Sequence, residues 1–269
     1  LAAICVAAIL LIGLGIRERW RQPDGSLHLR FLNVGQGDSA LIVTPEGKTV
    51  VIDGGPDWST LESIGEFLPF FTRRIDLLVL SHPNLDHIVS FPEILKRYSV
   101  GAIALSGADH TLPRYREIFA LAAEKRVPIL TLSAGQIIDL DSGARMDILW
   151  PPESMPKGFT KNDNDASIVL MLRYGNHSAL FTGDIERAAE ETLVRAHASL
   201  KADILKTAHH GSRTSSSTGF LLVVRPDLAV ISVGENSYGH PRPEIVKRLK
   251  ETGSRVWRTD RDGTLEVIW

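Results

Sequence analysis

The sequence predicts an α/β (α+β) fold in which two sheets pack face to face and helices cover their outer faces. Two observations lead to this prediction. Apolar or alternating segments of strand length recur along the whole chain, and segments of helix length stand between them. Each sheet has an apolar face that must be covered, and two packed sheets with helices outside meet that need.

The apolar segments and the residues that end them place the individual elements. Residues 75–80 are apolar apart from Asp76, as in a buried strand. Residues 167–174 and 178–182 flank a Gly175-Asn176 turn, which indicates a hairpin, and the helix 243–252 opens at a proline and closes before Gly253. In chain order, the predicted strands cover residues 29–34, 39–44, 49–53, 75–81, 102–106, 145–150, 167–174, 178–182, 204–207, 228–232, 255–258 and 264–268, and the predicted helices cover 61–70, 113–125, 185–200 and 243–252.

The first residues differ in character from the rest. Residues 1–16 are almost wholly apolar and arginines follow them, but a full membrane span needs about 20 residues. We therefore expect residues 1–21 to be the C-terminal part of a transmembrane helix with a basic flank, 22–28 to be a linker, and 29–269 to be one domain. The arginines that follow the apolar segment favour a cytoplasmic placement of that domain.

Composition excludes two classes of protein. The net charge of -2 is not that of a stand-alone nucleic-acid binder, which usually carries a basic face, so DNA would have to be delivered to this protein. The single cysteine, Cys5, lies in the apolar segment and excludes a disulfide framework.

Histidine and oxygen ligands follow the apolar strand directly, in the segment Ser-His-Pro-Asn-Leu-Asp-His at 81–87. His82, Asn84 and Asp86 can share one side of an extended loop, and His87 then points elsewhere, so two neighbouring ions could be served. By itself, this segment is equally compatible with a solvated loop.

Two later segments repeat the design. Asp184 follows the predicted strand 178–182, although a carboxylate in this place could instead cap the helix after it. His209 and His210 follow the short strand 204–207. Three such clusters, each at a strand end, together predict a shared metal site.

The same motifs resemble a known family. The segments 81–87, Thr-Gly-Asp at 182–184 and His-His-Gly-Ser at 209–212 look like those of a metallo-β-lactamase-fold hydrolase. Further segments resemble the C-terminal domain of the ComEC competence proteins: Leu-Asn-Val-Gly-Gln-Gly-Asp-Ser at 32–39, Val-Ile-Asp-Gly-Gly at 51–55, Asn-Asp-Ala-Ser-Ile-Val-Leu at 164–170 and Ser-Tyr-Gly-His-Pro at 237–241.

The resemblance runs from about residue 29 to 269 and carries several implications. It implies a metallo-β-lactamase αββα four-layer sandwich and a metal-dependent nuclease that degrades the DNA strand not taken up during transformation. It also implies a place at the bacterial inner membrane, on the extracytoplasmic side, which the charge bias opposes. Its implied partners are DNA delivered as a single strand by the uptake machinery, a membrane channel in the same polypeptide, and other competence proteins.

By resemblance, the site residues take distinct roles. His82 and Asn84 would serve a first ion, Asp184 would bridge two ions, and the second ion would be held by Asp86, His87 and one of His209 and His210. The expected catalytic residues are Asp86, His240 and Lys206. The residues expected to support the ligands are Asp53, Asn164 and Ser212.

Two departures from the wider hydrolase pattern shape the expected metal. Asn84 stands where many relatives carry His or Asp, and the third histidine expected before Asp184 is absent. The first site is therefore oxygen-rich and weak, which favours Mn²⁺ over Zn²⁺, with Zn²⁺ still possible. Two other functions remain open: hydrolysis of another phosphodiester or ester, and a catalytically weak module that guides DNA.

Overall fold

The computed structural model describes residues 21–108, 110–153, 163–196 and 199–269, together with residues 5–6, 13, 15 and 18–19. The predicted transmembrane segment at residues 1–16 lies largely outside the described residues. Within the described part of the chain, no helix combines the length and apolar character needed to cross a membrane.

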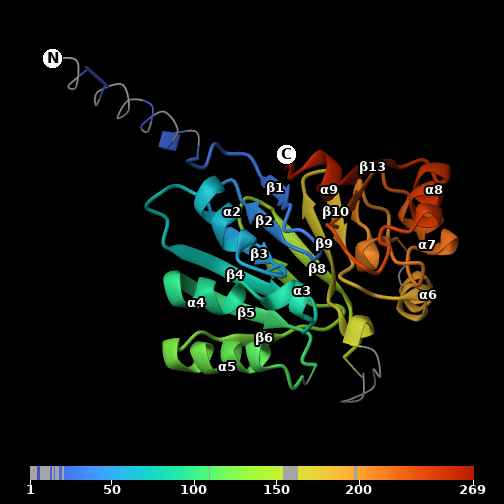
Figure 1. Ribbon diagram of the computed structural model, residues 1–269, viewed down its shortest axis with the longest axis horizontal. Helices are drawn as coiled ribbons and strands as arrows, with labels where there is room; N and C mark the ends of the chain where they lie inside the picture. Colours follow the sequence, from blue (N-terminus) through green and yellow to red (C-terminus); the bar gives the residue numbers. More distant parts are fainter. Residues whose placement is uncertain are drawn as a thin grey trace.

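Two sheets form the centre of the molecule (Figure 1). The first has the strand order β14-β1-β2-β3-β4-β5-β6 and the second the order β13-β12-β11-β10-β9-β8-β7. The strands of the first sheet are β14 (Leu265–Ile268), β1 (His28–Phe31), β2 (Ala40–Val43), β3 (Thr49–Ile52), β4 (Arg74–Leu80), β5 (Ser99–Leu105) and β6 (Ile129–Thr131). Those of the second are β13 (Arg255–Arg258), β12 (Leu228–Ile231), β11 (Ile204–Lys206), β10 (His177–Phe181), β9 (Val169–Tyr174), β8 (Arg145–Trp150) and β7 (Ile137–Asp139).

Alternation along the strands divides the apolar side chains between two faces. In β10, Ala179 and Phe181 enter the core between the sheets, whereas Leu180 packs on the outer face. In β1, Phe31 faces the same inner core, and its ring lies 5.4 Å from that of Phe181 across the two sheets. This period of two is the reason that each sheet has one face for the other sheet and one for helices.

Helices cover both outer faces, as Figure 1 shows. Those on the first sheet are α2 (Ser59–Phe67), α3 (Leu85–Ile88), α4 (Phe91–Arg97) and α5 (Pro113–Lys125). Those on the second are α6 (Arg187–Ala196), α7 (Thr218–Val224) and α8 (Pro243–Glu251). The short helix α9 (Thr259–Asp262) and the 3₁₀ turns η1 (Asp163–Ala166) and η2 (Ala208–Gly211) complete the described elements. The predicted α/β class and four-layer αββα sandwich are confirmed.

The sequence did not predict several short elements. Strands β6 and β7 are edge strands of three residues each, and their side chains are largely exposed, so they lack the apolar run that marks a buried strand. Helices α3 and α4 were missed because neither is longer than seven residues. The helix predicted from residue 185 begins two residues later, at Arg187, and residues 197–198 of its predicted end lie outside the described residues.

Candidate metal centre

Both sheets contribute to one site at the ends of their strands. The first sheet supplies residues from the loops after β1, β3 and β4, and the second supplies residues from the ends of β10, β11 and β12. In chain order these residues are Asp38, Asp53, Ser81, His82, Asp86, His87, Asp184, Lys206, His210 and Ser232. The site therefore exists only where the two sheets meet, although its residues span more than half of the chain.

Four of the predicted residues form a compact cluster: Asp86, His87, Asp184 and His210. One possible ligand atom from each lies within 4.8 Å of all the others. The Asp184 Oδ2 atom is 3.4 Å from His87 Nε2 and 3.3 Å from His210 Nε2, while Asp86 Oδ2 is 3.2 Å from His210 Nε2. Two imidazoles and two carboxylates at this spacing make a donor set for one divalent ion.

Hydrogen bonds from the outer nitrogen atoms set how the two imidazoles face the cluster. His210 Nδ1 donates to the carbonyl oxygen of Ser232 at 2.9 Å, and His87 Nδ1 lies 2.9 Å from Asp53 Oδ2. A carbonyl oxygen and a carboxylate oxygen can only accept from these nitrogens, so the Nε2 lone pairs are directed inward when the rings are neutral. Support of this kind is what metal-binding histidines ordinarily receive.

The cluster also passes a test of fit to an ion. Among the described residues, His82 Nε2, His87 Nε2 and His210 Nε2 are buried atoms with no hydrogen-bond partner, and each lies within 4.0 Å of Asp184 Oδ2. Buried polar atoms are nearly always satisfied, so several that converge on one point indicate a missing binding partner. A divalent cation is the partner that two imidazole lone pairs and two carboxylates share.

Charge in the cluster is balanced by protons when no ion is bound. Burial raises the pKa of Asp184, but His210, His87 and Lys206 outweigh burial and hold its pKa well below the usual range. Burial lowers the pKa of His210, yet Asp184 and Asp38 raise that pKa well above the usual range. Protons and a metal ion therefore compete for the same imidazole nitrogens.

The predicted first-ion residues are arranged differently from the cluster. His82 Nε2 is buried without a partner and lies 4.0 Å from Asp184 Oδ2. Burial, together with the charge of His87, lowers the pKa of His82 to about 3, so this ring is neutral and able to accept a cation. Asn84 turns away, because its Nδ2 atom donates to Asn164 Oδ1 at 2.9 Å.

The two adjacent histidines are separated by their backbone. His209 and His210 both have positive φ, 50° and 52°, and their rings lie 6.2 Å apart. His210 enters the cluster, whereas His209 is part-exposed and faces Glu186, with Nδ1 3.5 Å from Glu186 Oε1. The sequence left open which histidine faces the ion, and the geometry favours His210.

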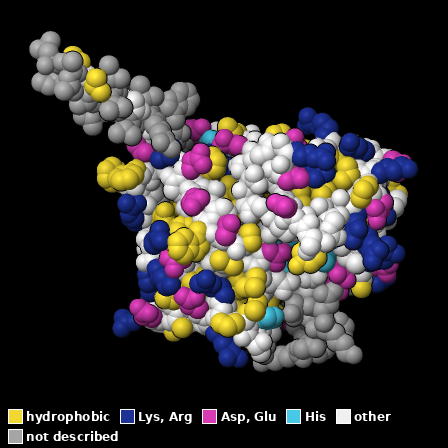
Figure 2. Space-filling model, viewed as in Figure 1, with side chains coloured by type: hydrophobic (Ala, Val, Ile, Leu, Met, Phe, Trp, Pro, Cys, Tyr) yellow, Lys and Arg dark blue, Asp and Glu magenta, His cyan; other side chains and the backbone are white. Residues whose placement is uncertain are grey.

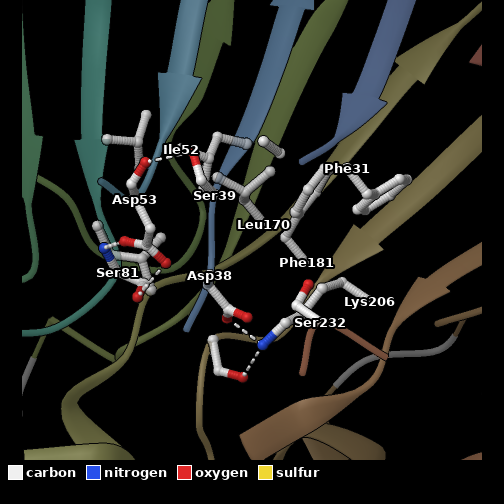
Figure 3. Close-up of a pocket in the computed structure, with 14 residues that line it drawn as sticks. Phe31, Asp38, Ser39, Ile52, Asp53, Ser81, Leu170, Phe181, Lys206 and Ser232 are labelled. Carbon is white, nitrogen blue, oxygen red and sulfur yellow. Dashed lines mark hydrogen bonds and ion pairs between the residues drawn. The ribbon is translucent and has the colours of Figure 1, made fainter. Parts of the chain in front are cut away.

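Lys206 is a buried cation behind the cluster. Its side chain is 4% exposed, forms an ion pair with Asp38, donates to the Gly183 carbonyl at 3.2 Å, and lies 3.6 Å from Asp184 Oδ1. Figure 3 shows Lys206 and Asp38 directed toward each other at one end of a small cavity of about 20 Å³ between the sheets. Burial lowers the pKa of Lys206, but Asp38 and Asp184 outweigh burial and raise it above its usual value.

Asp38 is the residue that the sequence reasoning missed as part of the site. A Cβ atom on Gly37 would lie 2.4 Å from the Asp86 carbonyl oxygen, and the Asp38 amide donates to that same oxygen at 3.1 Å. Glycine is needed there because the loop packs directly on the backbone of α3. The useful signal was an acidic residue next to a glycine that permits close approach.

The remaining predicted residues lie at the mouth of the site. Burial and the nearby His209 lower the pKa of His240 to about 4, so its ring is neutral at neutral pH. A neutral imidazole is a weak proton donor, so proton donation is disfavoured as the catalytic role of His240. The Ser212 hydroxyl lies 3.0 Å from Thr214 Oγ1 and supports the loop after η2 rather than a ligand directly.

Asp184 does not cap a helix. Its backbone amide donates to the Ser167 hydroxyl oxygen at 3.0 Å, and α6 begins only at Arg187. The carboxylate is 3% exposed and faces His82, His87, His210 and Lys206. The alternative that this residue is present for capping is thus disfavoured.

Comparisons with known proteins agree with the fold. Residues 32–235 match the family model of the Metallo-beta-lactamase superfamily. The ComE operon protein 3 of Bacillus subtilis is 29% identical over 254 residues, which cover 88% of this chain and 32% of that protein. The competence protein ComA of Neisseria gonorrhoeae is 30% identical over 282 residues, which cover 98% of this chain and 38% of that protein. The chain thus spans about a third of the length of these relatives.

Among solved structures, the metallo-beta-lactamase fold protein YhfI of Bacillus subtilis superposes with a TM-score of 0.62 at 11% identity. The match covers 90% of this chain and 100% of that chain. At this identity the likeness concerns the fold alone. It agrees with the two packed sheets and their outer helices.

Proposed function

Because this chain belongs to the metallo-beta-lactamase superfamily and carries the His/Asp cluster of a metal-dependent hydrolase, we propose that it is the DNA nuclease domain of a DNA-uptake channel. Its substrate is the strand that is not transported during transformation. The observation that carries the proposal is the convergence of buried, unsatisfied nitrogen and oxygen atoms, in a chain that aligns over most of its length with proteins named for competence.

The chain's own residues would hold and orient the reacting groups. Asp86, His87, Asp184 and His210 would hold one divalent ion, and His82 with Asp184 would offer a weaker second position. When bound, such an ion supplies Lewis-acid chemistry, polarising a phosphoryl oxygen and promoting the ionisation of water. Asp53 keeps the His87 lone pair directed inward, and Ser232 does the same for His210.

Other residues supply fixed charge and hydrogen-bond donors. Lys206 holds positive charge against Asp184 Oδ1 from the protein interior and therefore does not reach the substrate. At the mouth, His240 presents a neutral imidazole and His209 a part-exposed one. The ring N–H groups of both are able to donate to a phosphate oxygen. No serine or cysteine nucleophile is needed in such a centre.

Mn²⁺ is the ion we favour, with up to two per chain. The cluster offers two carboxylates beside two imidazoles, and the second position adds a single imidazole; such a mixed set accepts Mn²⁺ as well as Zn²⁺, and its two carboxylates suit the harder ion. The domain lies at the bacterial inner membrane, and we favour the extracytoplasmic side. Single-stranded DNA, the membrane channel of the same polypeptide and other competence proteins are its proposed partners.

The variant Asp184→Asn tests this function against Asp139→Asn as a matched control. Asp139 is exposed on β7, so its substitution changes the same charge away from the site. We expect Asp184→Asn to fold, to lose bound Mn²⁺ in calorimetric titration, and to lose cleavage of labelled single-stranded DNA. Asp139→Asn should retain both. Undiminished cleavage by Asp184→Asn would refute the mechanism, and wild-type hydrolysis of a model phosphodiester without cleavage of DNA would favour another hydrolase.

A further inference from the structure

An arginine-lined groove lies beside the candidate metal centre. It has a volume of about 430 Å³ and runs between α6 and α7, with α8 at one wall. Its cationic side chains are Arg187 and Arg195 from α6 and Arg248 from α8. On the face seen in Figure 2, Lys and Arg side chains lie at the end of the molecule that carries these helices and also at the opposite end.

The groove is connected to the centre through the loop after η2. The Arg187 amide donates to the Thr214 carbonyl at 3.0 Å, and the Thr214 hydroxyl lies 3.4 Å from His209 Nδ1. Arg187 is also only three residues from Asp184, so their Cα atoms are at most about 11 Å apart. A DNA strand that passes the centre therefore brings a phosphate to Arg187 within about three or four nucleotides. Phosphates of one strand rise about 3.4 Å each in a duplex, and they lie farther apart when the strand is extended.

The groove concentrates positive charge in a chain whose net charge is -2. Three arginines face it and one carboxylate, Glu191, offsets part of their charge. Arg248 is held in place because its guanidinium donates to the Ser216 carbonyl at 2.8 Å. Arg195 donates to the Thr192 hydroxyl at 3.3 Å, while Arg187 is exposed to solvent. Guanidinium groups that are partly fixed in advance lose less conformational freedom when they bind a phosphate.

We infer that this groove binds the phosphate backbone of a single DNA strand on one side of the bond that is cut. The inference rests on the proposed nuclease function and extends it to a path for the substrate. It explains how a chain with no overall basic character can retain DNA: a few arginines placed next to the centre suffice for backbone contacts that carry no sequence preference.

The double variant Arg187→Ala/Arg195→Ala tests the inference. Its control is Arg116→Ala/Lys125→Ala on α5, which removes the same charge from a helix of the other sheet. With Mn²⁺ present, KM is measured for a 20-nucleotide single strand and for a dinucleotide at several salt concentrations. For single strands each phosphate contact contributes about 0.7 to the slope of log affinity against log salt, so losing two contacts lowers the slope by about 1.4. If the affinities are equal at 1 M salt, losing one contact lowers the affinity at about 0.1 M salt about fivefold, and losing both lowers it about 25-fold.

We expect KM for the 20-nucleotide strand to rise about that much in the groove variant, and far more than KM for the dinucleotide. Arg187→Lys/Arg195→Lys should restore most of the slope, and Glu191→Gln should lower KM. An unchanged slope in a folded groove variant, or an equal loss in the α5 control, would overturn the inference and leave the groove to an acidic protein segment. Such results differ from a failure of the nuclease function itself, in which wild type would not cut either substrate.

Discussion

The buried pair Lys206–Asp38 gives the sharpest prediction about stability. The two side chains are 4% and 7% exposed, and the Gly183 carbonyl and Asp184 are further partners of Lys206. Lys206→Met removes the cation and leaves the Asp38 carboxylate buried. Asp38 then retains His210, whose Nδ1 atom lies 3.4 Å from its Oδ1 atom, as its nearest positive group.

The expected cost follows from this loss of a partner. Breaking a buried ion pair on one side typically costs about 3–5 kcal/mol. Because His210 offsets part of the charge, we expect about 3 kcal/mol for Lys206→Met, which lowers Tm by about 6–12 °C in a domain of this size. The double variant Lys206→Met/Asp38→Asn removes both charges, so its cost should fall short of the sum of the single variants by about 1–3 kcal/mol.

Urea unfolding at pH 7 with a chelator present measures these values apart from any metal binding. Lys247→Met is the matched control, because Lys247 is exposed and forms a surface pair with Glu251 at 3.6 Å. Its cost should stay below about 1 kcal/mol. The reasoning is refuted if Lys206→Met costs no more than Lys247→Met, or if the Lys206 and Asp38 substitutions are additive within about 0.5 kcal/mol.

Three other predictions concern the ion and a second buried carboxylate. His210→Asn should abolish tight Mn²⁺ binding in calorimetric titration while His209→Asn changes it little; the reverse order would assign the site to the other histidine. Mn²⁺ should support DNA cleavage better than Zn²⁺ at equal concentration. Asn84→Asp, which cannot donate to Asn164 as the amide does, should free a carboxylate for the first position and lower the Mn²⁺ concentration needed; a Zn²⁺ preference or an unchanged requirement would contradict this reasoning. Burial raises the pKa of Glu190 above 4.5, so the stability that its carboxyl group contributes is present below pH 4.5 and is lost as pH rises through the folded pKa. Glu190→Gln should therefore cost more at pH 4 than at pH 7 by urea unfolding, and an equal cost at both would show that burial does not set this pKa.

How far the sequence could predict the fold depended on burial. Strands β4 and β10 were found because their apolar residues are continuous or alternate, whereas β6 and β7 were missed because an exposed edge strand needs neither pattern. Short helices such as α3 also escape, since one turn is too short to show a helical period.

The candidate site shows the same limit from another side. The residues of the compact cluster were all named from motifs, because each belongs to a short polar segment that follows a strand. Contacts between distant parts of the chain could not be predicted from the local sequence. Nothing in the local sequence says that Asn84 bonds to Asn164, or that Lys206 turns inward to Asp38, because these partners are 80 and 168 residues apart.

The origin of the ligands in both sheets has a consequence for how the molecule opens. Asp86 and His87 follow the first sheet, and Asp184 and His210 follow the second, so an ion in the cluster acts as a clamp across the seam between the two halves. Separating the halves must release the ion, and binding therefore adds RT ln(1 + [ion]/Kd) to the free energy of that separation. Amide protons of β10 and β3, which lie in different sheets, should then slow their exchange with solvent together as the ion is added. Loading with metal in this way makes two layers behave as one cooperative unit.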